Sequence, residues 1–240
     1  MAAARWILLL ASVIAWLLAA CGTPASDQVT TTPARPADAA DGPTSPGAVR
    51  PLPSPERRQG MALSEALDRR RSVRSFKSTP LADEELGQLL WAAQGLNDGD
   101  GRRTAPSAGA TYPLVLVVAT ADGLFRYDVE RHALGAMAPD DVRVAIADAA
   151  IAQTWIAAAP VIVVIAAVPG RTEARYGARA ERSIALEAGH AAQNLLLQAT
   201  ALGLGAVPVG AFDDDRLARV IGLEPGEKPL YVVPVGRPAK

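Results

Sequence analysis

The arginine-rich stretch RRRSVRSF, residues 69–76, carries the side chains best suited to binding a ligand. Guanidinium groups bind phosphate oxygens in pairs, and a neighbouring hydroxyl adds a compact donor. The phosphate of a mononucleotide would fit such an anion site, formed by Arg70, Arg71, Ser72 and Arg74. Phe76 would anchor the stretch, and Arg237, just after the last predicted strand, is a candidate to reach the same phosphate. The alternative is a solvated basic patch, which is what most arginine runs are.

The composition limits the classes of partner. The chain has 240 residues, half of them hydrophobic, so it can bury a substantial core in one domain. Its 24 basic and 25 acidic residues nearly balance, and the formal net charge is −1. Binding along a nucleic acid backbone needs a broad basic surface, so we expect no nucleic acid partner. The arginine cluster is therefore expected to bind something small.

Other catalytic chemistries have little support in the sequence. Glu187 and His190 form a Glu-x-x-His pair with the spacing used in di-iron bundles, but such a site needs two of these pairs and further carboxylates. We therefore predict no metal site, and interpret His190 as a polar residue on a packed helix. The sequence contains neither a G-x-S-x-G nucleophile motif nor a P-loop. If the protein is an enzyme, a cofactor must supply the reactivity.

The N-terminus has the pattern of an export signal. Arg5 precedes an apolar run that ends in LAACG, where Cys21 is the single cysteine of the chain. This resembles the lipobox of bacterial lipoproteins. It implies a signal peptide over residues 1–20, a lipid on Cys21, and a protein anchored to a membrane on the extracytoplasmic side of the bacterial cell envelope. The alternative is a cytosolic protein in which the match is fortuitous.

Two regions are predicted to follow the signal peptide. Residues 21–59 are rich in Pro, Ala, Thr, Asp and Ser and have almost no large apolar side chain, so we predict a disordered tether. Residues 60–240 are predicted to form the folded domain.

Periodicity and turn signals predict the elements of this domain. Helical patterns cover residues 61–70, 82–95, 139–159, 175–202 and 213–221. Strand patterns cover residues 112–120, 123–129, 161–168, 205–210 and 230–236. Gly203 is the expected cap of the longest helix. A hairpin and an early pair of helices interrupt the regular alternation of a doubly wound fold, so we predict an α+β sandwich with helices over a mostly antiparallel sheet.

Four blocks of the sequence together resemble the nitroreductase superfamily of flavoproteins, in particular its SagB/ThcOx-type dehydrogenase branch. They span most of the predicted domain and come in the order expected for that family. The blocks are RRSVRSF (70–76), RTAPSAGATYPLVLVV (103–118), LEAGHAAQNLLLQATALGLGAVPVGAFDDDRL (186–217) and PLYVVPVGRP (229–238).

The resemblance implies a three-layer sandwich that forms a homodimer with FMN at the subunit interface. It assigns the FMN phosphate to Arg70, Arg71, Ser72 and Arg237, and the edge of the flavin ring to Arg74. The partner chain would supply Pro106, Ser107, Ala108 and Gly109. Near N5 of the ring it places Pro208, Val209, Gly210 and Ala211, and it expects Asn194 to face the pocket. Hydride would pass through N5 in a ping-pong reaction with NAD(P)H or a small organic substrate, without a catalytic side chain.

One departure from the SagB/ThcOx-type pattern bears on the reaction. Members that oxidise azolines carry a basic residue and a tyrosine just before the LEAGH block, whereas this chain has Arg182 and Ser183 there. The resemblance therefore gives no support to a general base at this place. The alternative function is a non-catalytic lipoprotein that keeps the fold as a flavin-binding or interaction module.

Overall fold

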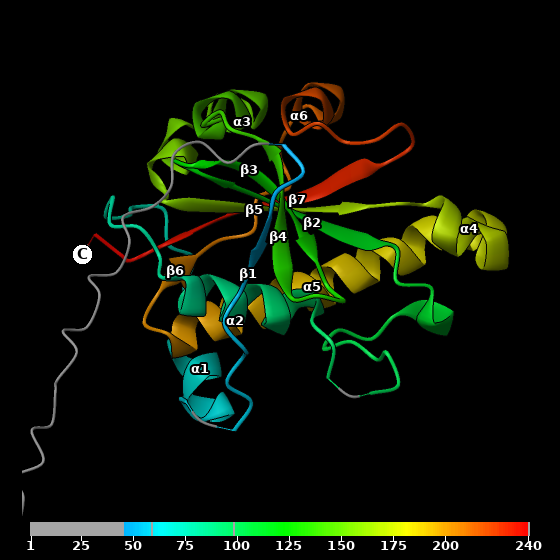
Figure 1. Ribbon diagram of the computed structural model, residues 1–240, viewed down its shortest axis with the longest axis horizontal. Helices are drawn as coiled ribbons and strands as arrows, with labels where there is room; N and C mark the ends of the chain where they lie inside the picture. The colour runs from blue at the N-terminus through cyan, green and yellow to red at the C-terminus, as the bar shows by residue number, and fades with distance from the viewer. Residues whose placement is uncertain (1–45, 59, 98, 240) are drawn as a thin grey trace, which may run out of the picture. The chain divides into compact units, whose positions relative to one another are not determined.

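The computed structural model describes residues 46–58, 60–97 and 99–239. These residues form an α+β sandwich with a central sheet between two layers of helices (Figure 1). The predicted signal peptide, Cys21 and the predicted tether as far as residue 45 lie outside the described residues. The fold class predicted from the sequence is confirmed.

Seven strands of the described chain form one sheet in which every neighbouring pair is antiparallel, in the order β1-β4-β3-β2-β5-β7-β6. They are β1 (Val49–Pro51), β2 (Leu114–Thr120), β3 (Gly123–Asp128), β4 (Ala133–Ala138), β5 (Val161–Ala167), β6 (Gly205–Ala206) and β7 (Lys228–Gly236). The central strands β2 and β5 are runs of Val, Ile and Leu that are almost wholly buried, as predicted.

Six α-helices occur in the described residues: α1 (Leu63–Arg69), α2 (Asp83–Gln94), α3 (Arg143–Ala149), α4 (Gly170–Tyr176), α5 (Ala180–Ala201) and α6 (Asp214–Val220). Short 3-10 turns are η1 (Ala108–Ala110), η2 (Thr154–Ala158) and η3 (Gly177–Arg179). Within this part of the chain, no helix has both the length and the apolar character needed to cross a membrane.

Side chains alternate between two apolar cores on opposite faces of the sheet. Leu116 and Val118 of β2 join the core that includes α2 and α5. Val117 and Ala119, which point the other way, join the core that includes α3 and α6. Figure 1 shows α2 and α5 on one side of the sheet and α3 and α6 on the other. The long helix α5 thus runs along one face, and its two ends position different candidate site residues.

The folded unit begins before Gly60, the boundary that composition predicted. β1 pairs with β4, and Leu52 after it is buried. The backbone N–H of Glu56 donates to Oε1 of Gln88 at 2.8 Å. Residues 46–58, part of the predicted tether, therefore belong to the domain, because backbone pairing and one buried leucine hold a segment of otherwise polar composition.

Two predicted helices are divided by left-handed backbone. The helix predicted over 139–159 is α3 followed by η2, and Ile151 and Ala152 between them have φ of +56° and +52°. The helix predicted over 175–202 begins at residue 180 instead, since Gly177, with φ +52°, separates α4 from the later elements. A positive φ cannot continue a right-handed helix.

The sheet edges also differ from the sequence-based prediction. The sequence did not predict β4, whose residues ALGAMA lack the β-branched and aromatic side chains typical of strands. The strand predicted at 205–210 pairs over β6 and then through a bridge between Val209 and Val232. Leu202 is the C-cap of α5, one residue before the predicted Gly203. Gly203 follows it with φ +70° and donates its N–H to Thr200 O at 3.0 Å, the place after a helix where glycine is favoured.

Candidate functional site

The segment after α1 runs along one end of the sheet. Ser72 forms a parallel bridge with Ala206 of β6, and Lys77 N donates to Arg237 O at 2.9 Å. Phe76 is buried, as predicted for an anchor. A Cβ added at Gly205 would lie 2.6 Å from the Cβ of Val73, so this close approach requires glycine. Three blocks that lie far apart in the sequence therefore meet at this place. We call residues 70–74 the arginine strip.

The arginines of the strip differ from their neighbour Arg69 in what they contact. Arg69 forms an ion pair with Glu65 at 2.7 Å. The guanidinium of Arg71 donates to the carbonyls of Asp68 and Arg70 at 2.6 and 2.8 Å, which leaves its charge uncompensated. Among the described residues, Arg70, Arg71 and Arg74 have no carboxylate partner within salt-bridge distance. Three positive charges of this kind, two of them on exposed side chains, suit an anionic ligand.

Arg237 reaches the strip with its backbone, but its side chain is engaged elsewhere. Its Nη2 donates to Oε1 of Glu85 at 2.9 Å, and its Nη1 to Pro80 O at 3.4 Å. Glu85 also accepts the backbone N–H of Ala82 at the start of α2. The structure thus brings Arg237 to the right end of the sheet and pairs its guanidinium with a carboxylate.

The loop after β6 lies next to the strip through η2. The N–H of Val209 donates to Val232 O at 2.8 Å, so the loop is fixed to β7. Nε2 of Gln153 donates to Ala211 O at 3.3 Å, which ties the loop to the start of η2. Trp155 of η2 in turn lies under Arg74, whose guanidinium carbon is 5.8 Å from the ring centroid, a cation–π distance. Trp155 was not among the site residues predicted from the sequence.

The Pro106–Gly109 segment lies elsewhere. Oγ of Ser107 accepts the backbone N–H of Tyr112 at 2.9 Å, and Gly109 O accepts from Arg175 of α4 at 3.1 Å. A Cβ at Gly109, where φ is +59°, would come within 2.7 Å of the Tyr176 hydroxyl. The turn also packs against α5 through η1, and Ser107 is one of the groups that act on the carboxyl group of Glu187 in the first half of that helix. We call residues 106–112 the PSAG turn.

One length of α5 separates the two parts of the candidate site. The PSAG turn packs against α5 near Glu187, and the strip is paired with β6 beyond Ala201, where α5 ends. At 1.5 Å per residue this part of the helix is roughly 20 Å long. Figure 1 shows β6 near one end of α5 and α4 near the other. A single chain therefore gathers the strip, the loop and Arg237, and leaves the PSAG turn apart from them.

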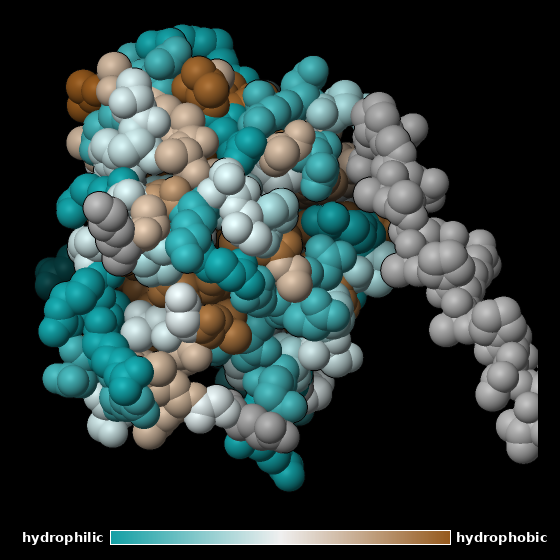
Figure 2. All heavy atoms as spheres, turned by 90° about the vertical axis from the view of Figure 1, so that its left-hand side faces the viewer, coloured by the Kyte–Doolittle hydropathy of each residue, from teal (hydrophilic) through white to brown (hydrophobic). Residues whose placement is uncertain are grey.

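Asn194 lies between these ends, on a shallow groove rather than on the strip. Its Nδ2 donates to Thr104 O at 3.3 Å. The groove has a volume of about 300 Å³ and is bordered by Leu63, Trp91 and Ala201. Figure 2 views the molecule from the end at which β6 lies, and hydrophobic patches are interspersed there with hydrophilic residues. Asn194 thus borders this groove and contacts the chain two residues before the PSAG turn, away from the strip.

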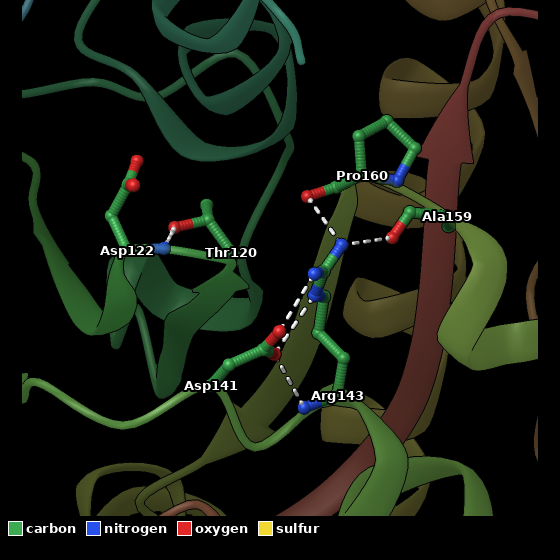
Figure 3. Close-up of polar contacts among 6 residues, drawn as sticks. All are labelled: Thr120, Asp122, Asp141, Arg143, Ala159 and Pro160. Carbon is green, nitrogen blue, oxygen red and sulfur yellow. Dashed lines mark hydrogen bonds and ion pairs between the residues drawn. The ribbon is translucent and has the colours of Figure 1, made fainter. Parts of the chain in front are cut away.

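A larger cavity of about 500 Å³ lies next to Phe76, but its two arginines, Arg50 and Arg143, are each paired with a carboxylate, and Arg50 lies 3.7 Å from Asp83. Arg143 donates to both carboxylate oxygens of Asp141, at 2.9 and 2.7 Å, and to Ala159 O at 3.0 Å (Figure 3). The same hydrogen bonds hold the pKa of Asp141 below its ordinary value. Arg143 therefore ties α3 to the start of β5, and the strip remains the better anion site.

Glu187 and His190 do not share an environment. Glu187 is 3% exposed, and burial raises the pKa of its carboxyl group, against the opposing effects of Ser107 and Arg103. His190 is exposed rather than packed, which corrects the sequence-based interpretation. Within the described residues, no group of three or more His, Cys, Asp or Glu could hold a metal ion. The one sequence signal for Glu187 was an acidic residue on the apolar face of a helix.

Taken together, the fold and the strip define an α+β sandwich with three arginines, unpaired with any carboxylate among the described residues, at one end of its sheet. Residues 67–237 match the model of the nitroreductase family. A candidate nitroreductase of Methanocaldococcus jannaschii is 44% identical over 181 residues, which cover 73% of this chain and 90% of that protein. The chain belongs to the nitroreductase family, and this membership makes it an oxidoreductase in the general sense.

Solved structures agree with this assignment. The crystal structure of a candidate nitroreductase from Ralstonia eutropha JMP134 has a TM-score of 0.74 at 35% identity, and the match covers 80% of this chain and 90% of that one. The NADPH:FMN oxidoreductase of Vibrio harveyi, solved in complex with NAD+, has a TM-score of 0.56 at 22% identity, with 74% and 69% covered. The second likeness shows a common fold.

Proposed function

We propose that the protein is an FMN-dependent oxidoreductase that transfers a hydride, by a ping-pong reaction, between NAD(P)H and a small organic substrate. The observation that carries the proposal is the arginine strip: three guanidinium groups without a carboxylate partner among the described residues, next to the loop at 208–211. A member of the nitroreductase family with this charge arrangement has the donors that a flavin phosphate requires.

The residues at this end of the sheet fit FMN in their chemistry. Arg71 and Ser72 are exposed, Arg70 is half-buried, and these three residues would hold the phosphate. Arg74, held over Trp155, would bring a positive charge to the edge of the ring. When bound, FMN supplies the hydride transfer that no side chain of the protein can perform. Arg237 would have to leave Glu85 to join the phosphate site.

We further propose a homodimer in which each FMN contacts both subunits. The distance along α5 supports this, because the PSAG turn of one chain cannot reach the strip of the same chain without rearrangement of the fold. A two-fold axis would bring the turn of one subunit to the strip of the other, and vice versa.

Within the family, we propose the SagB/ThcOx-type branch, on the four sequence blocks given above. Ser183 Oγ donates to Arg179 O at 3.4 Å, within the helix, which gives no support to a general base at Arg182 and Ser183. We therefore favour a reducible acceptor such as a nitroaromatic or a quinone over an azoline. Lipid anchoring through Cys21 outside the cytoplasm is part of the proposal and rests on the sequence alone. Mass spectrometry of the N-terminus would detect the acylated Cys21.

An absorbance experiment tests the function. The purified mature protein, incubated with FMN and freed of excess, should be yellow, lose its flavin absorbance with NAD(P)H under anaerobic conditions, and regain it with a nitroaromatic or quinone. A colourless protein would overturn the proposal. Bound FMN that no donor reduces would instead indicate the alternative, a non-catalytic flavin-binding lipoprotein.

A further inference from the structure

Arg74 is the arginine of the strip whose charged group contacts an aromatic ring. Its guanidinium carbon lies 5.8 Å from the ring centroid of Trp155. Among the described residues, the guanidinium has no ion pair and no hydrogen bond. An exposed arginine samples many side-chain conformations, and contact with the face of an aromatic ring narrows that range. Trp155 therefore decides where the charge of Arg74 lies.

An aromatic partner differs from an acidic one in its effect on the charge. At the same end of the sheet, Arg237 is held by the carboxylate of Glu85 at 2.9 Å, which compensates its charge. The indole ring of Trp155 attracts a cation through its quadrupole and carries no net charge. Trp155 can therefore hold Arg74 in place and leave the full positive charge available to a ligand.

Trp155 is itself fixed by the core of the protein. Its half-buried side chain packs against the core that includes α3 and α6. The next residue of η2, Ile156, is fully buried, and its N–H donates to Gln153 O at 2.9 Å. The indole therefore lies between this core and the strip, as a fixed support for an exposed side chain.

The backbone that leads into η2 is strained. Ile151 and Ala152 have φ of +56° and +52°, in the left-handed region, where a β-branched residue is an outlier. The Ile151 side chain is 69% exposed, so its burial does not compensate for this conformation. Strained backbone persists only where surrounding contacts determine it, and it gathers at ligand-binding sites. The strain therefore points to the residues that follow, and to where they must lie.

The same segment is tied to the loop at 208–211. Nε2 of Gln153 donates to Ala150 O at 2.9 Å and to Ala211 O at 3.3 Å. Residues 150–155 therefore contact the loop through Gln153 and the strip through Trp155. These are the two parts of one chain that the proposed function places at the ring of FMN.

We propose that Trp155 is a positioning residue for the ring-side charge: it holds the guanidinium of Arg74 at the edge of the flavin ring without neutralising it. This inference rests on the proposed function. A positive charge at the edge of the ring stabilises reduced FMN, which carries more negative charge than oxidised FMN. The aromatic face at position 155, rather than the volume of the side chain, therefore raises the reduction potential of the bound cofactor.

Variants at position 155 separate positioning from packing. Trp155→Phe keeps an aromatic face, and Trp155→Leu keeps an apolar side chain without one. Trp155→Met covers the case in which W155L does not fold. Arg74→Ala removes the charge, and W155L is also made in that background. Leu223→Ala, which shortens another half-buried side chain of the same core, is the matched control.

The readout is the midpoint potential of bound FMN, measured anaerobically at saturating FMN against a dye of known potential. A merely structural role of Trp155 would change the stability of the protein and leave this potential unchanged. We expect W155L and W155M to favour oxidised over reduced FMN about threefold more than the wild type, which lowers the two-electron potential by about 14 mV. W155F and L223A should keep the wild-type potential.

The Arg74→Ala background tests whether Trp155 acts through the arginine. R74A should lower the potential at least as far as W155L does, and adding W155L to R74A should lower it no further. The inference is overturned, and the proposed function stands, if W155L keeps the wild-type potential, if W155F or L223A lowers it equally, or if W155L still lowers it in the R74A background. A wild-type protein that binds no FMN overturns both.

Discussion

Neighbouring arginines with the same chemistry have different roles here because their surroundings differ. Arg69 is neutralised by Glu65, one helical turn before it, whereas Arg71 contacts only carbonyl oxygens among the described residues and remains a free charge. An exposed ion pair of the first kind contributes little to stability, and the second kind is available to a ligand. The two residues therefore form a natural pair of test and control.

Arg71→Ala should weaken FMN binding by about tenfold to a hundredfold, the range expected for the loss of one charge-assisted hydrogen-bonding group. Arg69→Ala should leave the affinity within about twofold, since its charge is already paired. Titration of FMN fluorescence against each purified variant measures both. Equal losses in the two variants would mean that the strip acts as a diffuse basic patch and not as a site.

The ion pair between Arg237 and Glu85 competes with a phosphate for the same guanidinium. Glu85→Gln removes the negative charge and keeps an oxygen for the Ala82 N–H at the start of α2. We expect E85Q to bind FMN roughly twofold to fivefold more tightly, the range of an exposed ion pair. Glu84→Gln, on the exposed side of the same helix, is the control and should change nothing. Weaker binding by E85Q would show that Glu85 helps to position Arg237.

At the scale of elements, the N-terminal segment of the domain, residues 46–58, is held by the hairpin of β3 and β4. His132 in this hairpin has φ +46°, and its Nε2 donates to Pro53 O at 2.9 Å. Because a carbonyl can only accept, the Nδ1 of the neutral ring accepts the Tyr127 hydroxyl hydrogen at 2.7 Å. Burial lowers the pKa of His132, so the folded state favours this neutral ring. Because the pKa of His132 is lower in the folded state, the neutral ring stabilises the fold fully at pH values above the ordinary pKa of histidine. This stabilisation is lost as the pH falls through the lowered pKa.

Acid should therefore loosen the N-terminal segment before it unfolds the domain. The amide of Leu52, which donates to His132 O at 3.0 Å, should lose hydrogen-exchange protection several-fold between about pH 7 and pH 5. In His132→Gln the protection of Leu52 should be lower at neutral pH and should not depend on pH in this range. If the protection of the Leu52 amide in the wild type stayed constant between these pH values, protonation of His132 would not control the N-terminal segment.

Some strands of the sheet could be predicted from the sequence and others could not. β2 and β5 could be predicted because their runs of Val, Ile and Leu have no other stable place than a buried sheet. β1 and β4 could not, because Ala, Gly and Pro give no strand signal, and these strands form through pairing of β1 with β4 and of β4 with β3. In the same way, the chemistry of the strip could be predicted from the sequence, because it depends on four residues close together in the chain, Arg70, Arg71, Ser72 and Arg74. The ion pair of Arg237 and the burial of Glu187 depend on contacts with residues that are distant in the sequence.

At the scale of the whole molecule, α5 keeps the two parts of the candidate site apart. Its first half packs against the PSAG turn, and the chain after its last turn forms β6, which pairs with the strip. A rigid helix of roughly 20 Å therefore lies between the two parts within one chain. In the proposed homodimer, the strip of each subunit would lie next to the turn of the other.

Complementation between two defective subunits tests this arrangement. One variant, Arg71→Ala with Ser72→Ala, has a damaged strip and an intact PSAG turn. The other, Gly109→Leu, has an intact strip and a damaged turn, because the new side chain meets the Tyr176 hydroxyl at a backbone φ of +59°. Each homodimer should bind FMN poorly. In a heterodimer isolated with two different affinity tags, both defects fall in one site and the other site consists entirely of intact parts.

The heterodimer should therefore bind about one FMN with wild-type affinity, whereas the wild-type dimer binds about two. If each site were built within one chain, both sites of the heterodimer would contain a defect, and it would bind FMN as poorly as the two homodimers. Equilibrium dialysis against FMN, with light scattering to establish the dimer, separates these outcomes. The stoichiometry would thus report which chain supplies the PSAG turn, independently of the electron donor or the substrate.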